Sequence, residues 1–415
     1  MRFIIAQNYR HLNFPYFISK RISQQTKGSF SSIISRIAVI SITVAVASLL
    51  LSFMILLGFQ NKIKEKIYSF SGHLVIGKYA LSNSFEEASI MLNDTLRDQL
   101  NHGDIKHWQP YALKAGLLKA GDEIQGVVVK GVTPRQDFDR LRKHMVQGRM
   151  LEFDKENYST EVVVSRKISK VLELELGEEV LIFFMQNPPR YRKLRVVGVY
   201  ETGLEEFDEN IIYGDLALIR RINLWKAQEV GGVEVFANDV TEIEAVQNAV
   251  FDRIGYDLFV EKVSDRYLQI FDWLSLLNRN VAIFLVLILF VAGFSMVSIL
   301  LILIMERTQM VGIFKALGAT NKLLGKIFLA SGIQLILRGL IWGNLVAFSI
   351  GITQYYFHII PLDAKSYYMD HVPIEFSIPA IFGVNLLVVI LIGLSLYIPV
   401  NFIFRIDPIK SIRFD

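Results

Sequence analysis

The chain has 415 residues, a formal net charge of +4 and no cysteine, and 52% of its residues are hydrophobic. This apolar fraction is higher than a soluble protein of this length requires. The lack of cysteine excludes disulfide bonds and thiolate metal sites. The composition therefore predicts a membrane protein whose domains are held together by packing.

Four long runs without any charged residue indicate membrane-spanning helices. Each is longer than the ~20 residues that cross a bilayer core of about 30 Å. Residues 1–36 carry six Lys or Arg and no Asp or Glu, which favours a cytoplasmic amino terminus, and four spans return the carboxy terminus to the same side. The uncharged runs are residues 37–61, 281–305, 339–362 and 376–404.

These runs divide the chain into successive predicted segments. The fold class that follows is a membrane protein, a four-helix transmembrane bundle with a large α+β periplasmic domain inserted between the first and second spans. The predicted segments are 1–36 (an interfacial segment), 37–61 (first span), 62–272 (outer domain), 273–305 (second span), 306–326 (coupling helix and elbow), 327–357 (third span), 358–375 (outer loop), 376–404 (fourth span) and 405–415 (cytoplasmic tail).

The amino-terminal segment mixes basic side chains with Phe and Tyr, which is typical of a segment lying among lipid headgroups, although a disordered basic tail has a similar composition. In the first span, small residues recur at spacings of three and four and so share one helix face. Small side chains let another helix approach closely, so this face predicts helix contact at a dimer interface or cavity, unless the grouping is chance. The residues are Ala38, Ser41, Ala45, Ser48 and Ser52, with Gly339 and Gly343 making a similar series in the third span.

The outer domain alternates short β-branched or aromatic runs with polar segments. The runs at 125–131, 161–164, 180–184, 194–200 and 232–236 predict strands, and residues 86–100 and 240–254 predict helices. We expect two lobes, the smaller one β-rich and formed by residues of about 134–225.

Two polar stretches of this domain invite a functional interpretation. Residues 186–193 form a predicted hairpin tip on which Arg190, Tyr191 and Arg192 would suit an acidic partner, although loop tips are polar in any case. Residues 201–215 contain six carboxylates. Their spacing lacks the calcium-loop pattern, so a solvated acidic face is favoured over a cation site.

The segment between the second and third spans predicts a helical elbow. Met310, Ile313, Phe314 and Leu317 fall at helical spacing on one face, and Gly318 supplies a left-handed stop, after which Thr320 or Asn321 can cap the next helix. Such a helix can lie on the membrane surface and offer its apolar face to a soluble partner, although inert linkers show the same pattern.

The sequence has no motif for catalysis or for phosphate binding. Residues 318–326 come nearest to a phosphate-binding loop, but their spacing fails, and neither a zinc-protease nor a serine-hydrolase motif occurs. The chain is therefore predicted to be a non-catalytic subunit without a cofactor or a metal of its own, and no nucleic-acid partner is expected.

Residues 305–319, Met-Glu-Arg-Thr-Gln-Met-Val-Gly-Ile-Phe-Lys-Ala-Leu-Gly-Ala, resemble the coupling segment of FtsX/MacB-type (type VII) ABC transporter permeases. Further similar stretches are Gly58-Phe-Gln60, 148–177, 198–208, the glycine series of the third span and the tail at 398–413, although a family glycine near Ile336 is missing. The resemblance covers nearly the whole chain. It is closest to the lipoprotein-releasing LolC/LolE membrane subunits.

This resemblance implies a permease in the bacterial inner membrane that extracts lipoproteins and passes them to a periplasmic carrier. A dimeric ABC ATPase, which binds ATP and magnesium, and a second permease copy or paralogue would be its partners. The hairpin at 186–193 is shorter than the hook with which one subunit of the family grips the carrier. The residues implied in ATPase coupling are Glu306, Arg307, Met310, Ile313, Phe314, Lys315, Leu317 and Gly318.

Three alternatives remain open from the sequence. A MacB-like exporter would carry its ATPase on the same chain, and a regulator of a cell-wall hydrolase of the FtsX kind would have a shorter outer domain. A structural adaptor would leave the elbow without a partner. The depth and role of Arg338, a cation in the third apolar segment, are also open between a functional site and a side chain that reaches the membrane interface.

Overall fold

The computed structural model describes residues 30–79, 88–154 and 157–403, and it divides into two compact units. The first unit holds the described residues up to Gln60, Ser275–Ile360 and those from Val372 onwards. The second unit holds Asn61–Leu274 and Pro361–His371. The predicted tail at 405–415 and most of the interfacial segment at 1–36 lie outside the described residues.

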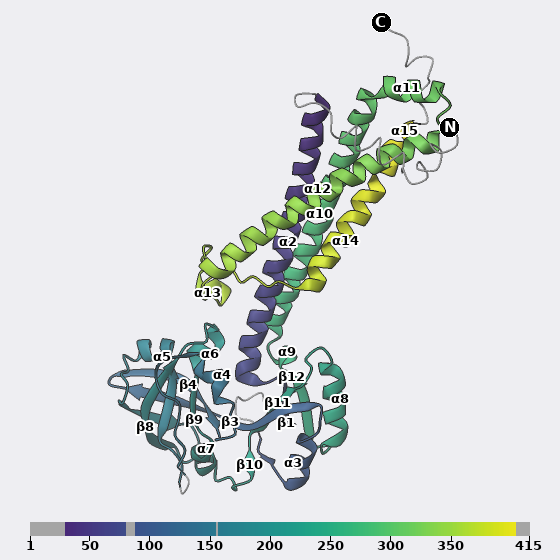
Figure 1. The fold of residues 1–415 in the computed structure, drawn as a ribbon. Coiled ribbons are helices and arrows are strands. Elements are labelled where there is room, and N and C mark those ends of the chain that lie inside the picture. Colours follow the sequence, from purple (N-terminus) through teal and green to yellow (C-terminus); the bar gives the residue numbers. More distant parts are fainter. Residues whose placement is uncertain (1–29, 80–87, 155–156, 404–415) are drawn as a thin grey trace, which may run out of the picture. The chain divides into compact units, whose positions relative to one another are not determined.

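The first unit is a bundle of long apolar helices (Figure 1). Within the described part of the chain, four helices are long and apolar enough to cross a membrane. One buried apolar cluster joins them, and each also exposes large apolar side chains, as helices in lipid do. The helices are α2 (Phe30–Ser71), α10 (Leu268–Glu306), α12 (Asn321–Phe357) and α14 (Ile378–Ser395) followed by α15 (Tyr397–Phe402), with α11 (Thr308–Ala316) between α10 and α12. The short helix α13 (Ala364–Tyr367), which follows α12, belongs to the second unit.

The helices extend past the predicted spans at several ends. The sequence predicted spans at 37–61 and 273–305, whereas α2 continues to Ser71 and α10 begins at Leu268. The uncharged run marks only the part that fits hydrocarbon, because backbone hydrogen bonding of a helix does not depend on whether its side chains are charged. Both helices therefore contribute residues to both units.

The second unit is built on a mixed sheet with helices at its ends. Its strands are β1 (Leu74–Lys78), β2 (Ile90–Met91), β3 (Ile105–Ala120), β4 (Glu123–Val132), β5 (Met145–Gly148), β6 (Glu161–Ser165), β7 (Glu179–Phe184), β8 (Arg190–Tyr200), β9 (Ile211–Asp215), β10 (Glu229–Val230), β11 (Gly232–Ala237) and β12 (Leu258–Lys262). Its helices are α3 (Asp94–Leu100), α4 (Phe138–Arg142), α5 (Arg166–Val171), α6 (Glu205–Asn210), α7 (Leu216–Asn223), α8 (Ile243–Arg253) and α9 (Val263–Arg266).

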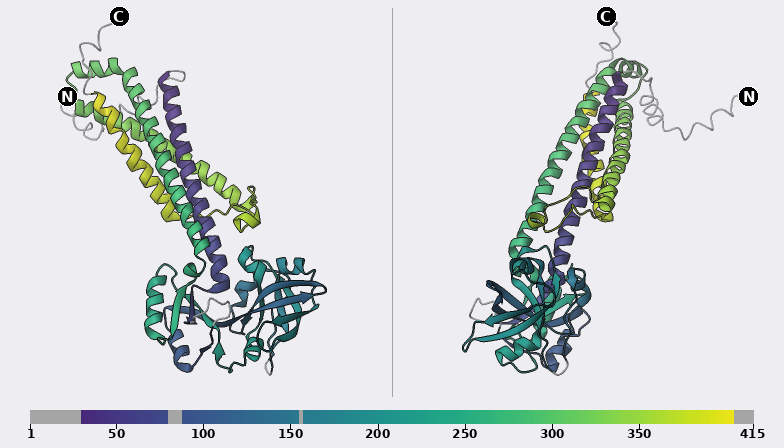
Figure 2. Two further views of the ribbon diagram at one scale, coloured as in Figure 1. Left: turned by 180° about the vertical axis from the view of Figure 1, so that it is seen from behind. Right: turned by 90° about the vertical axis from the view of Figure 1, so that its left-hand side faces the viewer.

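The strand order of the main sheet, within the described residues, is β12-β1-β11-β3-β4-β9-β6-β8-β5, with β7 paired to β3 and β8. Strand β3 links the two halves, because it pairs with β11 up to Tyr111 and with β4 from Ala112 onwards. Figure 2 shows β3 crossing the unit between these halves. The predicted division into two lobes remains a prediction, since the structure has one compact unit and one continuous sheet here.

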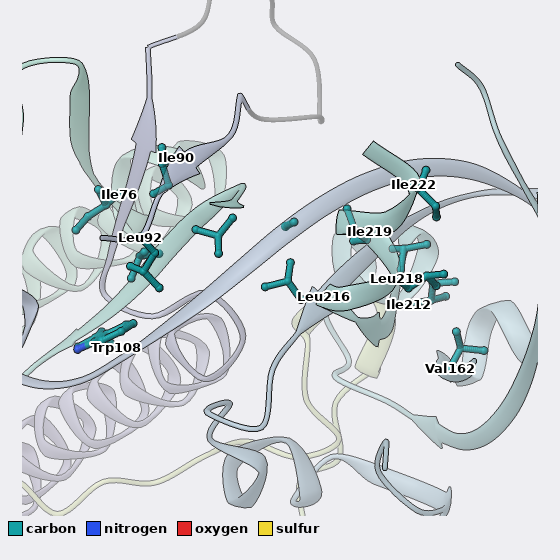
Figure 3. Packing of buried hydrophobic residues seen from close by; sticks show 14 of the residues in the cluster. Ile76, Ile90, Leu92, Trp108, Val162, Ile212, Leu216, Leu218, Ile219 and Ile222 are labelled. Atoms are coloured by element: carbon teal, nitrogen blue, oxygen red, sulfur yellow. The ribbon is translucent and has the colours of Figure 1, made fainter. Parts of the chain in front are cut away.

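The core of this unit follows the sheet from end to end (Figure 3). Near one end, Trp108 packs with the cluster that includes Ile76 and Leu92, and its indole Nε1 donates to Asn101 Oδ1 at 2.9 Å. Towards the other end, the buried face of α7, including Leu216 and Ile219, packs against β3, β4 and β9. Packing of this kind stabilises the domain without disulfides, as the composition requires.

The predicted strands at 125–131, 161–164, 180–184, 194–200 and 232–236 are confirmed as β4, β6, β7, β8 and β11. The predicted helix at 240–254 is confirmed as α8. The prediction of a helix throughout 86–100 is wrong for residues 88–93. There Ile90 pairs with Val230 in a short strand. Asn93 Oδ1 accepts the Leu96 amide hydrogen at 2.8 Å and so caps α3, which begins only at Asp94.

Candidate functional site

The candidate site is the elbow formed by α11 and the turn into α12. Helix α11 ends at Ala316, and the backbone then turns at Gly318, whose φ of 93° is a left-handed value that favours glycine. The hydroxyl of Thr320 accepts the Leu323 amide hydrogen at 3.3 Å and caps α12. The predicted helix, stop and cap are thus confirmed.

The apolar side chains of the elbow point in two different directions. Val311 is buried, and Met310 and Phe314 pack against the apolar core of the helix bundle. Ile313 and Leu317 instead point outward, with 48% and 79% of their surface exposed. The prediction that all four apolar residues present one free face needs this correction, because two of them anchor α11 to the bundle.

Lys315 also contacts the helix bundle. Its ammonium Nζ donates to the carbonyl oxygen of Ile403 at 3.0 Å, at the end of α15. A cation beside the last carbonyls of a helix satisfies groups that have no partner within the helix. Glu306 is exposed and Arg307 is half-buried at the junction of α10 and α11. Ile313, Leu317 and the exposed Gln309 and Ala316 therefore make up the outer surface of the elbow.

The small residues of α2 and α12 lie where these helices meet within one chain. A Cβ at Gly339 would lie 2.5 Å from Ile42 Cγ2, and a Cβ at Gly343 would lie 2.6 Å from Val46 Cβ. On α2, Ala38 and Ala45 are buried, whereas the three serines of the stripe are half-buried. The stripe thus contributes to helix contact inside the bundle, and its role in a dimer interface or cavity stays a prediction.

The hairpin joining β7 and β8 presents a mixed tip. Arg190 donates to the carbonyl oxygens of Arg221 and Ile222 at 3.1 and 2.8 Å, so it holds the hairpin against the end of α7. Tyr191 is exposed, and Arg192 donates to the Tyr191 carbonyl oxygen at 2.8 Å. The proposed contact of these residues with a carrier stays a prediction.

Most carboxylates of the acidic stretch have local partners. Glu201 accepts from Arg166, and Glu205 accepts from Lys167, in exposed ion pairs. Asp208 is buried and accepts the amide hydrogens of Thr202 and Gly203, and burial raises the pKa of its carboxyl group. Such pairing is typical of a structural acidic face.

Sequence reasoning missed two polar groupings. Asn344 of α12 and Asn385 of α14 donate to each other's side-chain oxygens at 2.7 and 3.1 Å between apolar helices. In the outer domain, Lys130 and Glu234 form a buried ion pair at 2.5 Å. The signal for both was a polar residue within an otherwise apolar run, which is costly unless the residue is paired.

Two family models match this chain. Residues 35–252 match the MacB-like periplasmic core domain, and residues 282–408 match the FtsX-like permease C-terminal region. The second match contains the whole elbow. The first covers most of α2 and most of the second unit.

Curated relatives match over most of their length. The lipoprotein-releasing system transmembrane protein LolC of Neisseria meningitidis serogroup B is 23% identical, with 94% of this chain and 96% of the relative covered. LolE of Haemophilus influenzae is 22% identical, with 88% and 90% covered. The crystal structure of the periplasmic region of MacB from Actinobacillus actinomycetemcomitans covers 48% of this chain and 91% of its own, at 16% identity and a TM-score of 0.34, a similarity too low to carry an argument.

The matches and the fold agree with the resemblance of the elbow segment. A periplasmic domain of the MacB-like type, apolar helices fit to cross the inner membrane and an FtsX-like region around the elbow occur in one chain. The permease subunits of this family are in general non-catalytic. The chain belongs to the FtsX/MacB-like family of ABC transporter permeases and is close to the LolC/LolE membrane subunits.

Proposed function

We propose that this permease extracts acylated lipoproteins from the inner membrane and passes them to a periplasmic carrier. The observation that carries the proposal is the match to lipoprotein-releasing relatives along nearly the full length of the chain, outer domain and elbow included. Burial of an acyl chain stabilises membrane anchoring by about 0.8 kcal/mol per CH₂ group. Extraction therefore requires energy from a separate ATPase dimer, which would hold the ATP and magnesium.

The outer surface of the elbow is the port that we propose for this ATPase. Ile313 and Leu317 offer an exposed apolar pair one helical turn apart, which suits a groove on a soluble partner. Met310 and Phe314 fix the opposite side of α11 to the bundle core. A push on α11 would therefore be transmitted to the helices rather than absorbed by a loose loop.

The remaining parts of the proposal concern assembly and orientation. A second permease, either a copy or a paralogue, would complete a lipid-exposed cavity for the acyl chains, with both termini in the cytoplasm. The outer domain, with two lobes and the hairpin that carries Tyr191, would pass the cargo to the carrier. Closure of the ATPases would tilt α2 and α10 and expel the cargo by mechanical transmission.

The test compares the wild-type chain with Leu317→Asp and Asn321→Asp. Each variant adds one negative charge at an exposed position of the elbow, but the second lies in the first turn of α12, where acidic residues are tolerated. Tagged proteins are recovered from native membranes, and the retained proteins are identified by mass spectrometry. We expect Leu317→Asp to lose the ATPase while Asn321→Asp keeps it.

Cargo and partners decide between the functions. Acylated lipoproteins recovered with an ATPase support release, and a second permease in equal amount establishes a heterodimer. Recovery of a cell-wall hydrolase in place of lipoproteins would refute lipoprotein release. Retention of the ATPase by Leu317→Asp would refute the proposed port.

A further inference from the structure

The outer domain contains a cavity of about 740 Å³ that lies apart from the elbow. Its volume is within the range of small-molecule sites, about 300–1,000 Å³. Strands β3, β4, β9 and β11 and helix α6 contribute to its lining. Ser71 at the end of α2, Arg266 at the end of α9 and the next residue, Tyr267, complete it. All of these residues belong to the second unit.

The lining includes a buried ion pair. Lys130 and Glu234 expose only 5% and 3% of their side chains and lie 2.5 Å apart. Glu234 also accepts from Gln109 Nε2 at 2.7 Å, and Lys130 donates to the carbonyl oxygen of Phe70 in the last turn of α2. Burying two charges in this way costs several kcal/mol of desolvation, and a pair of apolar side chains of similar volume would stabilise the fold at least equally. The position of this pair in the cavity lining is consistent with a binding role.

Apolar and aromatic side chains make up most of the wall. Phe207 and Tyr111 are buried, and Leu113 and Tyr267 are half-buried. The Tyr267 hydroxyl shares a hydrogen bond with Ser71 Oγ at 3.3 Å. A wall of this kind favours the apolar part of a ligand, because rings and aliphatic groups gain by excluding water.

Exposed charges of both signs lie among the lining residues. Glu206 and Arg266 are both exposed, and Arg266 donates to the Tyr111 hydroxyl at 3.2 Å. Together with Lys130 and Glu234, the lining carries two cations and two anions. A zwitterion presents a group of opposite charge to each of these two exposed side chains, whereas a ligand that carries charge of only one sign matches only one of them.

We propose that this cavity binds one zwitterionic amphiphile, with its chain among the rings, its ammonium group towards Glu206 and its phosphate group towards Arg266. The chemical class is a single-chain phospholipid with an ethanolamine headgroup. This site is separate from the ATPase port, and its occupation does not depend on the proposed transport step.

The experiment uses the full chain in an uncharged maltoside detergent. The probe is a lysophosphatidylethanolamine with a photoreactive group in its acyl chain, and labelled peptides are identified by mass spectrometry. We expect labels on peptides that contain Tyr111, Phe207 or Tyr267. Unlabelled lysophosphatidylethanolamine should compete about tenfold better than lysophosphatidylglycerol of the same chain length, because the glycerol headgroup lacks the ammonium group that would contact Glu206.

Three variants make the result specific to the cavity. Leu113→Trp fills the cavity and should reduce this labelling about tenfold or more. Leu117→Trp is the matched control. Leu117 is half-buried, lies four residues further along the same strand on the same face, and does not line the cavity. Glu206→Gln, at an exposed position, should remove the preference for the zwitterion.

Three outcomes would overturn the proposal. Labels confined to α2, α10, α12 or α14 would show only lipid at the apolar helices. Equal competition by the anionic lipid would refute the zwitterion. Competition by free phosphoethanolamine at the same concentration would show that the site binds a soluble headgroup compound and not an amphiphile.

Discussion

At the scale of single residues, His73 links the stability of the outer domain to pH. It lies between α2 and β1, and its Nδ1 accepts the Ala237 amide hydrogen at 3.0 Å. Burial, together with the charges of Arg140 and Lys106, lowers the pKa of His73 to about 4. A protonated ring could not accept this hydrogen bond. The neutral form is therefore the one that fits the fold.

The sign of the pH effect follows from the direction of this shift. In the unfolded chain the pKa of a histidine is about 6.5, so as the pH falls this histidine binds a proton in the unfolded state before it does so in the folded state. The stabilisation is complete above that pH and is lost as the pH falls towards 4. We expect roughly 2 kcal/mol of lost protection from hydrogen exchange in β11 between pH 7 and 4, a value reduced for the partial exposure of the ring.

The control for this prediction is His73→Gln, which cannot titrate but keeps an acceptor. The difference in β11 protection between wild type and variant should change with pH, which removes the contribution of the carboxylates. An identical pH profile for both proteins would show that other groups cause the loss.

Leu224 offers a second prediction at this scale. It ends α7 with a left-handed backbone, at φ 58°, and 76% of its surface is exposed. A residue with a Cβ pays about 1 kcal/mol or more there, whereas glycine adopts this conformation freely. Leu224→Gly should therefore stabilise the outer domain by about 0.5–1 kcal/mol. Slower hydrogen exchange in α7 would confirm this, and faster exchange would contradict it.

At the scale of helices, the contact between α2 and α12 depends on glycine. A side chain at Gly339 or Gly343 would meet Ile42 or Val46 well inside contact distance. We expect Gly339→Ala and Gly343→Ala each to destabilise the bundle by about 1–3 kcal/mol, because the helices must separate or change rotamers. Thermal unfolding in detergent measures the effect.

Helix α14 supplies the matched controls for these variants. Gly383 and Gly393 have no atoms within 4 Å of the position that a Cβ would take. Gly383→Ala and Gly393→Ala should therefore be neutral or slightly stabilising, since alanine favours a helix more than glycine does. Equal loss of stability in all four variants would mean that helix flexibility, and not close packing, is the reason for the glycines.

At this scale the elbow was predicted from the sequence, whereas strand β3 was not. The period, stop and cap of α11 are local signals, and they predicted the element well. The period could not tell that Phe314 faces the bundle and Leu317 faces outward, because that depends on where α15 and α10 lie. Strand β3 was missed because Pro110 interrupts it. The structure accommodates this proline where β3 pairs with β11 alone.

At the scale of the whole molecule, the second unit takes in a segment that is remote in sequence. Residues 361–371, between α12 and α14, belong to this unit together with Asn61–Leu274. Composition predicted this segment only as an outer loop, because its attachment arises from tertiary contacts that no local pattern encodes. Three stretches thus connect this unit with the rest of the chain: α2, α10 and the segment 361–371.

We expect Lys66 to make the contact that holds this third connection, residues 361–371, in place. Its ammonium donates to the carbonyl oxygen of Tyr368 at 2.6 Å, and Tyr368 adopts a left-handed backbone with φ 61°. The Tyr368 ring also meets the Trp273 ring edge-on, with centroids 6.1 Å apart. Lys66→Met should remove a charged hydrogen bond while keeping the aliphatic stem. Protection of residues 361–371 from hydrogen exchange should fall about tenfold as a result.

Lys62→Met provides the comparison, because Lys62 lies one helical turn earlier and makes only an exposed pair with Glu65 at 3.2 Å among the interactions of its side chain described here. Exposed pairs of this kind contribute little, so protection of residues 361–371 should remain at the wild-type level. If Lys66→Met also leaves it unchanged, the aromatic contact with Trp273 holds the segment instead. If both variants lower the protection of residues 361–371, the effect comes from a general change in α2, and the hydrogen bond between Lys66 and Tyr368 does not itself stabilise the segment.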